Sequence, residues 1–264
     1  MNWEKAKNIN IVAFFILNAI LLIIRFHEPG LGTERIDSIT YILNKNGISL
    51  SEGFRFITPE AKRQIELSPR SLNPHNITGF FFLNNQNINL DDNIFSNVTE
   101  RMTFTPTGFL YENLGEERLL SDISATKSFA EDRLSELRLN MNLDYIRNKS
   151  NGFILAYRSY YLGEIIYSNH MIITVTDGNL YSIEFNYVPI TSFFGPERAL
   201  RPIDEILLNF MRLHQINRES SDKVVTILSV DIVYDLLSSE IAAPFFRIIF
   251  EYNGYEKNAL INAY

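Results

Sequence analysis

The stretch HMIITVTDGNLYSIEFNYVPI, residues 170–190, has the pattern of a β-hairpin. Apolar and polar residues alternate in MIITV and LYSIEF, as they do in strands that bury one face. The turn sequence Asp177-Gly178-Asn179 separates the two runs and tolerates the positive φ angles of a tight hairpin. The stretch therefore predicts two antiparallel strands and favours a sheet-rich fold.

A second hairpin is predicted at the C-terminal end. Residues 223–236, KVVTILSVDIVYDL, have strand character, and residues 244–264 contain two further runs separated by Asn253-Gly254. The preceding segment, RPIDEILLNFMRLHQI, has helical periodicity, with Pro202 in its first turn. Its predicted apolar face consists of Ile203, Ile206, Leu207, Phe210, Met211 and Leu213.

A helix is also predicted before the first hairpin, in residues 125–140, and strand-like residues 152–169 follow it. The two predicted helices start near residues 131 and 203, 72 positions apart, and the turn glycines are 76 positions apart. This spacing indicates two related units, each with a helix packed on an antiparallel sheet. The core-facing side chains of the first helix are expected to be Phe129, Leu134 and Leu137.

One more helix is predicted near the N-terminal end, in TERIDSITYILNKNG, residues 33–47. Thr33 is expected to cap its start, and Gly47 stands in the usual position after its end. Its buried face is expected to consist of Ile36, Ile39, Ile42 and Leu43.

The region after this helix has mixed patterns. GFFFLN at 79–84 and RMTFTPTGFLYEN at 101–113 predict strands, the second at an edge or a bulge because it contains Pro106. The Asn-rich residues 83–93 predict a surface loop. Further along, SFFGPERA at 192–199 predicts a break between elements.

The first thirty residues contain a long apolar run. From Ile9 to Phe26 it has 18 residues with Arg25 as its one charge, and as a helix it would span roughly 27 Å, the short end of what crosses a bilayer. No small-x-small cleavage site follows, which favours an uncleaved signal anchor over a cleaved signal peptide or a buried soluble helix. Lys5 and Lys7 predict a cytoplasmic N-terminus and an extracellular C-terminal part.

One face of this apolar helix is a candidate contact for a partner helix. Asn18 lies near mid-span, where an amide can be stabilised by hydrogen bonding to a neighbouring helix. A single helix also tolerates an asparagine, so both interpretations stay open. The side chains that share this face at helical spacing are Ile11, Phe14, Asn18, Leu21 and Arg25.

The predicted fold class is α+β, with an N-terminal transmembrane helix and an extracytoplasmic ectodomain of two lobes. The second lobe is expected to hold the two helix-plus-hairpin units. In chain order the predicted parts are a cytoplasmic head (1–8), a transmembrane signal anchor (9–27), a linker (28–33), a first α+β lobe (34–115) and a second α+β lobe (116–264).

Composition and charge argue against several functions. The net charge of −7 makes a nucleic-acid partner unexpected, because phosphate binding needs a basic surface. The chain has no cysteine, which removes disulfides and thiolate chemistry and fits a bacterial exported or anchored protein. The four histidines lack ligand spacing. We therefore expect no enzyme, cofactor or metal site, and we interpret as ordinary helix-end or loop residues the acidic pairs Glu116-Glu117, Glu131-Asp132 and Asp204-Glu205.

Several segments resemble one family. The head MNWEKAKNINIVAFFILNAILL resembles the start of YycI-type regulatory proteins, with its Met-polar-Trp opening, basic turn and Asn-containing apolar span. HMIITVTDGNLYSIEFNY is similar to the central hairpin of that family, and VVTILSVDIVYDL through NALINAY to its C-terminal strands. The resemblance is weak over residues 50–115. One departure is Phe246 before Arg247, where the family more often has a tryptophan.

The resemblance implies a single-pass accessory protein of the WalK–WalR (YycG–YycF) two-component system of low-GC Gram-positive bacteria. It implies a YycH/YycI-like ectodomain, contacts with the sensor histidine kinase and a YycH-like protein, partly through membrane helices, and a role in cell-wall homeostasis. It brings no catalytic residues.

The residues alone leave other functions open. An anchored sensor module could bind a peptide or wall fragment in a groove lined by the aromatic residues of 157–167 and 185–194, although core packing is the favoured explanation of these rings. An antiparallel sheet with an open edge could accept a partner strand. The third alternative is an enzyme acting on the cell wall.

Overall fold

The computed structural model describes residue 14 and residues 32–68, 73–82, 89–115, 119–120, 122–216 and 225–264. The helices described there are α2 (Thr33–Lys45), α3 (Pro74–Phe81), α4 (Ile123–Glu136) and α5 (Ile203–Ile216). The strands are β1 (Ile48–Leu50), β2 (Lys62–Leu67), β3 (Asn89–Asp91), β4 (Ile94–Ser96), β5 (Glu100–Phe104), β6 (Gly108–Asn113), β7 (Met141–Lys149), β8 (Gly152–Tyr161), β9 (Glu164–Thr176), β10 (Asn179–Asn186), β11 (Ile190–Arg198), β12 (Val225–Leu236), β13 (Ile241–Tyr252) and β14 (Tyr255–Asn262).

These strands form one mixed sheet. Its main path runs β11-β2-β13-β12-β9-β10-β6-β5-β4-β3, with β1 beside β12, β14 beside β13, and β7 beside β8, which in turn pairs with β9. Two contacts are parallel, β1 with β12 and β9 with β12. The β9–β12 contact has only two register pairs, Val233 with Ile165 and Tyr234 with Ile166. This short contact joins two larger halves of the sheet.

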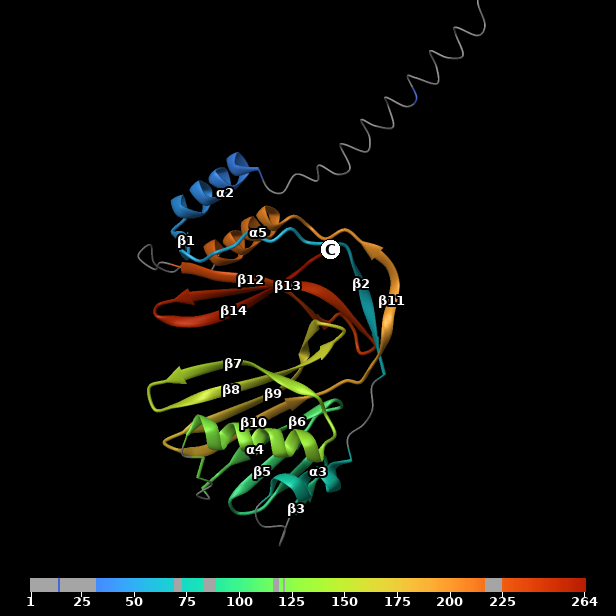
Figure 1. Ribbon diagram of the computed structural model, residues 1–264. Helices are drawn as coiled ribbons and strands as arrows, with labels where there is room; N and C mark the ends of the chain where they lie inside the picture. The colour runs from blue at the N-terminus through green and yellow to red at the C-terminus, as the bar shows by residue number, and fades with distance from the viewer. Residues whose placement is uncertain are drawn as a thin grey trace, which may run out of the picture.

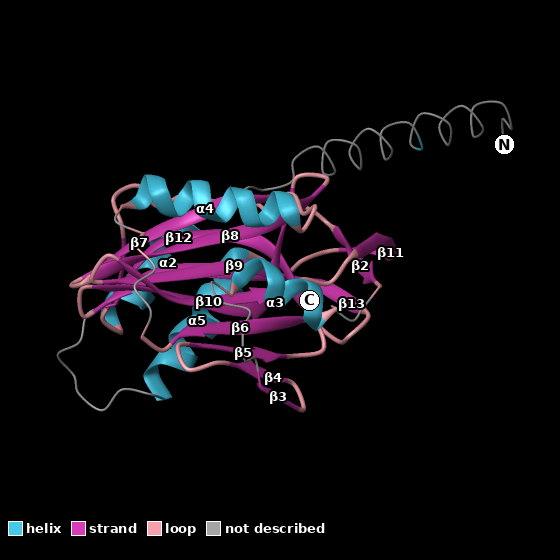
Figure 2. Ribbon diagram, turned by 90° about the horizontal axis from the view of Figure 1, so that it is seen from below, coloured by secondary structure: helices cyan, strands magenta, loops and turns pink. Residues whose placement is uncertain are grey.

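The two halves face each other. We refer to β1, β12, β13 and β14 as the upper half-sheet and to β3–β10 as the lower half-sheet, after their places in Figure 1. Helices α5 and α2 lie on the outer side of the upper half-sheet, and α4 and α3 on the outer side of the lower one (Figures 1 and 2). Strands β2 and β11 lie at one end of the molecule (Figure 1). The arrangement is an α+β fold of helices on a sheet, as the sequence predicted.

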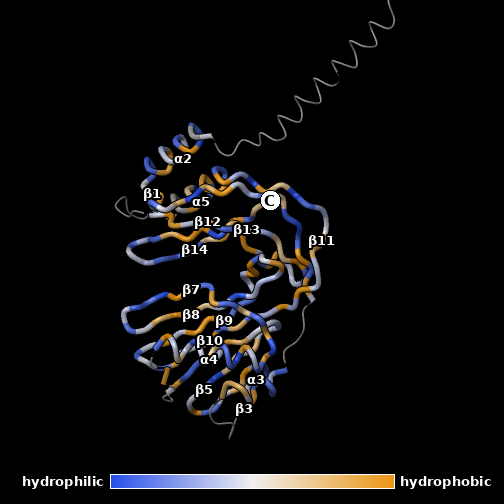
Figure 3. Tube along the Cα trace, in the orientation of Figure 1, coloured by the Kyte–Doolittle hydropathy of each residue, from blue (hydrophilic) through white to orange (hydrophobic). Residues whose placement is uncertain are grey.

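Each half-sheet has its own hydrophobic core beneath its helices. The lower core draws on residues 77–185, and Phe81 and Tyr111 are fully buried in it. The upper core draws on residues 39–50 and 200–263. A smaller cluster around Tyr234 fills the junction between the halves. Apolar residues recur along the strands of both halves (Figure 3), as expected when one face of each strand is buried.

These cores divide the chain differently from the two expected lobes. The upper core combines α2 and β1, from residues 34–115, with α5 and β12–β14, from residues 116–264. In the lower half-sheet, β6 pairs with β10 across the expected boundary. The physical reason is the long-range pairing of β1 with β12, which sets Ile48 beside Val225. Periodicity within short windows carries no information about such pairing.

Both predicted hairpins are confirmed. Asp177 and Gly178 have φ angles of 52° and 76°, and Asn253 and Gly254 have 55° and 75°. Two successive positive φ angles are typical of the type I′ turn, whose twist matches that of the strands. The flanking strands pair as β9 with β10 and β13 with β14. The helix-plus-hairpin units are α4 with β7–β10 and α5 with β12–β14, so the first unit has one strand more.

The predicted strand at 79–84 is wrong, because α3 covers its first part. The side chain of Asn73 accepts hydrogen bonds from two amides of the first turn, and Pro74 occupies the first helical position. The apolar run FFF indicated burial but had no period that separates a helix from a strand. The predicted loop at 83–93 contains the short strand β3 within its described residues.

Two other segments differ from their predictions. Residues 101–113 form a hairpin of β5 and β6 instead of one strand, and Pro106 lies in the connecting turn. The predicted break at 192–199 lies mostly within β11, which pairs with β2 through an irregular register between Phe194 and Arg198. Glycine and proline in this segment indicated an interruption, and pairing with β2 overrides that local preference.

The helices differ in detail. Gly32 is the N-cap of α2 and Thr33 its first residue, so Thr33 is not the predicted cap. Gly47, with a φ of 68°, follows the helix end as expected. Leu213 is 53% exposed and Ile42 is 39% exposed, so each falls outside the buried face predicted for its helix.

None of the described helices combines the length and the apolar composition that a membrane crossing requires. The predicted anchor, residues 9–27, lies outside the described residues except for Phe14.

Candidate functional site

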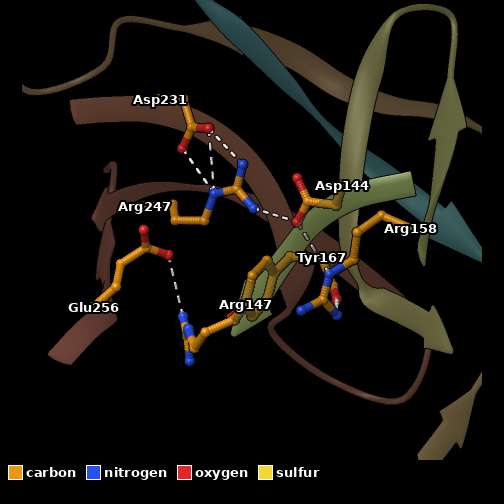
Figure 4. Close-up of polar contacts among 7 residues, drawn as sticks. All are labelled: Asp144, Arg147, Arg158, Tyr167, Asp231, Arg247 and Glu256. Atoms are coloured by element: carbon orange, nitrogen blue, oxygen red, sulfur yellow. Dashed lines mark hydrogen bonds and ion pairs between the residues drawn. The ribbon is translucent and has the colours of Figure 1, made fainter. Parts of the chain in front are cut away.

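A network of charged side chains connects the inner faces of the two half-sheets (Figure 4). Arg247 of β13 lies at its centre, with 6% of its side chain exposed. Its Nε lies 3.0 and 3.2 Å from the two carboxylate oxygens of Asp231, and its Nη2 donates to Asp231 Oδ2 at 2.6 Å. Its Nη1 donates to Oδ2 of Asp144 at 2.6 Å. Arg247 thus binds one carboxylate of its own half-sheet and one of the opposite half-sheet.

Strand geometry places these three side chains. Asp231 and Arg247 are register partners in the β12–β13 pairing, so their side chains project from the same face. Asp144 lies in β7, where the register with β8 shifts between Leu143 and Tyr145. A bulge of this kind changes the direction in which a side chain points. Here it accompanies a carboxylate that reaches the opposite half-sheet.

A second buried arginine lies beside Asp144. Arg158 of β8 is 2% exposed, and its Nη1 donates to the carbonyl oxygen of Tyr167 at 2.5 Å. Its Nε lies 3.6 Å from Oδ2 of Asp144. The Arg158 guanidinium lies 4.0 Å from the centroid of the Tyr167 ring, and the Arg247 guanidinium lies 5.8 Å from the same centroid. Two arginines therefore share one aromatic ring and one carboxylate.

An irregular segment of β9 supplies that aromatic ring. The β8–β9 register shifts between Arg158 and Ser159, which leaves residues 167–169 without counterparts on β8. The side chain of Asn169, fully buried, donates to the carbonyl oxygen of Val188 and accepts from its amide, both at 2.8 Å. The Asn169 side chain thus pairs with both backbone groups of Val188, as a residue of a neighbouring strand would, and holds the segment in place.

The charges of this network balance, with two arginines against two aspartates. Burial opposes the charge on Arg247, but hydrogen bonds to Asp231 and Asp144 outweigh it and raise the pKa of this arginine. A guanidinium that stays protonated has no proton to transfer near neutral pH. The arrangement is therefore suited to hold the two half-sheets together.

A weaker ion pair crosses the same space near the hairpin ends. Arg147 Nη2 of β7 lies 3.3 Å from Oε1 of Glu256 in β14, and the two side chains are 29% and 45% exposed. Partly exposed pairs of this kind contribute little to stability and are screened by salt. The connection between the halves is thus strongest at Arg247.

Two further carboxylates have shifted pKa values. His170 lies 3.2 Å from Glu184, and this hydrogen bond lowers the pKa of Glu184 against the opposing effect of burial. Burial raises the pKa of Asp235, although the amide of Leu236 and the charges of Arg158 and His170 act in the opposite direction. Both carboxylates face the positive charge of Arg158.

The residues predicted to contact a partner helix lie almost entirely outside the described part of the chain. Phe14 is helical and 66% exposed. The other four members of the predicted face are outside the described residues: Ile11, Asn18, Leu21 and Arg25.

The acidic pairs have ordinary positions where they are described. Glu131 and Asp132 are exposed on α4, and Asp204 in the first turn of α5 forms an ion pair with Arg35 at 2.6 Å. Glu116-Glu117 lies outside the described residues. In the described ranges, no three histidine or carboxylate side chains come together as metal ligands.

The aromatic strings considered for a groove lie mostly in the cores. Tyr157 and Phe185 are buried in the lower core, and Phe193 packs at the junction, with its ring 5.4 Å from that of Tyr161. A pocket of about 190 Å³ beside Phe193 is lined mainly by charged side chains. This volume is below the range typical of small-molecule sites.

Sequence reasoning missed the charged network. The signal was a single arginine inside an apolar strand, Arg247 in PFFRIIF and Arg158 in LAYRSYY. Such a residue is costly to bury without a partner, so it indicates a carboxylate elsewhere in the fold. The identity of that carboxylate depends on which strands face each other.

Comparison with known proteins identifies the fold. No protein-family model and no curated protein matches the chain. An uncharacterized protein from Eubacterium rectale is similar in structure, with a TM-score of 0.50 and 10% sequence identity, over 83% of this chain and 89% of the other. YycH from Bacillus subtilis has a TM-score of 0.51 and 11% identity, over 80% of this chain and 55% of YycH.

The chain therefore corresponds to about half the length of YycH. The C-terminal domain of YpeB from Bacillus megaterium also matches, but its TM-score of 0.36 is too low to carry an inference. At these identities the similarity concerns the fold alone. On that basis, this chain has a YycH-like α+β fold.

Proposed function

We propose that the chain is a non-enzymatic, membrane-anchored regulator of a WalK-type sensor histidine kinase. In this proposal a transmembrane helix at residues 9–27 and the extracellular fold contact the kinase and a YycH-like partner. The observation that carries the proposal is the fold similarity to YycH over 80% of the chain. The proposed effect of these contacts is to change the phosphorylation state of the kinase, which controls cell-wall homeostasis.

Two features of the chain support this proposal. The apolar run from Ile9 to Phe26 is long enough for a short membrane helix, and Asn18 near its centre suits contact with another helix. Among the described residues, Arg247 is the centre of a charge-balanced ion-pair network. Such a site stabilises an arrangement of two half-sheets. Both features fit a protein that acts through contacts.

The test replaces residues 9–26 with an unrelated apolar span of equal length. Kinase phosphorylation should lose its dependence on the chain, while protease accessibility of the C-terminal part at the cell surface stays unchanged. A sharper pair of variants is Asn18→Leu against Asn10→Leu, because Asn10 lies near the predicted inner interface. Only Asn18→Leu should weaken regulation. Full regulation by the swapped chain would show that contact through the membrane helix is the wrong mechanism.

A further inference from the structure

The last strand of the chain, β14, is an open edge of the sheet. It pairs with β13 over all eight of its residues, from Tyr255 opposite Tyr252 to Asn262 opposite Phe245, with no shift in register. Within the described residues, no other strand pairs with it. A regular strand with one unpaired edge is a template for a further strand.

The hairpin geometry identifies which backbone groups face outward. In a two-residue hairpin the residues that flank the turn, here Tyr252 and Tyr255, exchange hydrogen bonds, and every second residue after them does the same. Lys257 and Ala259 therefore direct their amides and carbonyls toward β13. Those of Glu256, Asn258 and Leu260 point away from the sheet. These three alternate residues thus offer unpaired backbone N–H donors and C=O acceptors.

The edge strand β7, which faces the upper half-sheet, is less suited to accept a strand. Its register with β8 shifts between Leu143 and Tyr145, and bulges are a common way of blocking edge pairing. Asp144 at this shift is already engaged with Arg247. β14 has no such irregularity, and its single lysine, Lys257, lies over the ring of Tyr252 at 4.9 Å. Of these two edge strands, β14 is therefore the better suited to accept a strand.

The side chains beside this edge indicate the charge of an incoming strand. Glu251 and Glu256 are register partners on adjacent strands, so two carboxylates lie directly opposite each other. Like charges in this arrangement are unfavourable. Arg147 compensates Glu256 at 3.3 Å, whereas Glu251 has no ion-pair partner among the described residues. The group of Glu251, Glu256 and Arg147 thus has one negative charge in excess, and a basic side chain beside Glu256 on an added strand would offset it.

A second copy of the chain does not meet this requirement. Antiparallel self-pairing through outward-facing residues sets Glu256 opposite an even-numbered residue of β14 in the other copy. These residues are Glu256, Asn258, Leu260 and Asn262, and none is basic. Self-pairing therefore adds no basic side chain beside Glu256.

We infer that β14 is a docking edge for an extended segment of another protein, which adds as a strand and carries a lysine or arginine opposite Glu256. The added strand continues the upper half-sheet beyond β14. Its backbone pairs with Glu256, Asn258 and Leu260, and its basic side chain lies beside Glu256, with β14 between it and Glu251. The inference does not depend on the identity of the partner in the proposed function, because it rests on backbone and charge alone.

The experiment uses the full-length chain in nanodiscs and two blocked peptides of alternating threonine and valine. One peptide carries a central lysine, and its twin carries glutamate in that position. With the lysine peptide, amide exchange at Glu256, Asn258 and Leu260 should slow by about tenfold or more at saturation, since these amides gain partners. The glutamate peptide should bind about tenfold more weakly.

Two variants separate docking from folding. Asn258→Pro removes one outward amide and leaves the β13 pairing intact, since proline is tolerated where the amide of an edge strand faces away from the sheet. This variant should bind the lysine peptide about tenfold more weakly. The amides of Lys257 and Ala259 should stay protected from hydrogen exchange. Glu256→Lys should reverse the preference, so that the glutamate peptide binds more tightly.

Three outcomes would overturn the inference. They are equal binding of the lysine peptide to Asn258→Pro and the unchanged chain, protection of β7 amides in place of those of β14, and concentration-dependent dimerisation that Asn258→Pro abolishes. The last would assign the edge to a second copy. The kinase assay of the proposed function is separate, so failure of one proposal does not affect the other.

Discussion

The outer and inner faces of the sheet are held by different forces. On the outer faces, helices cover apolar cores in which rings such as Phe210 and Phe246 have no exposed area. On the inner faces, the contacts between the half-sheets include ion pairs centred on Arg247. Hydrophobic burial is non-directional and large, whereas ion pairs depend on the exact partner and are modest in net effect. Each half is thus stable through its own core, and the relation between the halves depends on a few side chains.

This difference predicts that the two kinds of contact respond differently to mutation. Loss of an outer-face contact should unfold a half, and loss of an inner-face contact should first loosen the junction between the halves. The junction itself is narrow, because β9 and β12 share two register pairs. The following predictions test this contrast, from the largest expected effect to the smallest.

Phe210→Ala should have the largest effect. The Phe210 ring is fully buried and lies 5.0 Å from that of Phe250, so its removal leaves a cavity that lowers the free energy of unfolding by about 4 kcal/mol. Urea denaturation followed by circular dichroism measures this loss. The matched control is Leu213→Ala on the same helix, which is 53% exposed and should change stability by less than about 1 kcal/mol. Equal losses of stability in the two variants would contradict the placement of Phe210 in the core and of Leu213 at the surface.

Arg247→Met should follow. It leaves Asp144, whose side chain is 7% exposed, without its closest cation, and breaking such a pair costs on the order of 3 kcal/mol. The double variant Arg247→Met with Asp144→Leu should recover part of the loss, because the buried carboxylate of Asp144 is then gone, although Arg158 loses its neighbouring carboxylate. A double-mutant cycle measures the coupling. Additive losses would mean that the two half-sheets are not connected at this point.

Arg147→Gln should have a small effect. Its ion pair with Glu256 is partly exposed on both sides, so the free energy of unfolding should fall by about 0.5 kcal/mol at low salt. The difference should disappear near 1 M salt, where charges are screened within about 3 Å. A loss comparable to that of Arg247→Met would contradict the ranking of the two inner-face bridges.

His170→Ala should produce the smallest change, in one pKa. The hydrogen bond from His170 lowers the pKa of Glu184 below its ordinary value of 4.5. The contribution of this bond is therefore present above pH 4.5 and lost as the pH falls through the lowered pKa of the folded protein. In the variant the pKa should rise toward or above 4.5, since burial then acts without the bond. An NMR titration of the Glu184 carboxyl carbon measures this pKa. An unchanged pKa would show that the hydrogen bond from His170 does not lower it.

Much of the fold was accessible from local sequence patterns. The two type I′ turns, the helices α4 and α5 and the strand β12 all followed from periodicity and turn residues, because those preferences act over a few positions. The failures lie where tertiary contacts override such preferences. FFF at 80–82 belongs mostly to a capped helix, and SFFGPER is largely a strand because β2 pairs with it.

The candidate site was less accessible than the fold. The arginines at 158 and 247 are visible as charges within apolar strands, but Asp144 and Asp231 are ordinary residues in the sequence. Asp144 and Arg247 are 103 positions apart. Their contact exists because β7 faces β13 across the two half-sheets, and no local pattern encodes which strands face each other.

By itself, the sequence determined the α+β class, the hairpins, the lack of cysteine chemistry and an apolar N-terminal run that predicts an anchor. These properties depend on composition and on spacing within a few turns of chain. Only the tertiary structure decided that α2 and β1 join the C-terminal strands, that Arg247 bridges two half-sheets, and that β14 is left as an open edge. Each of these depends on pairing between segments distant in sequence, where the free energy comes from mutual burial and charge compensation that neither segment has alone.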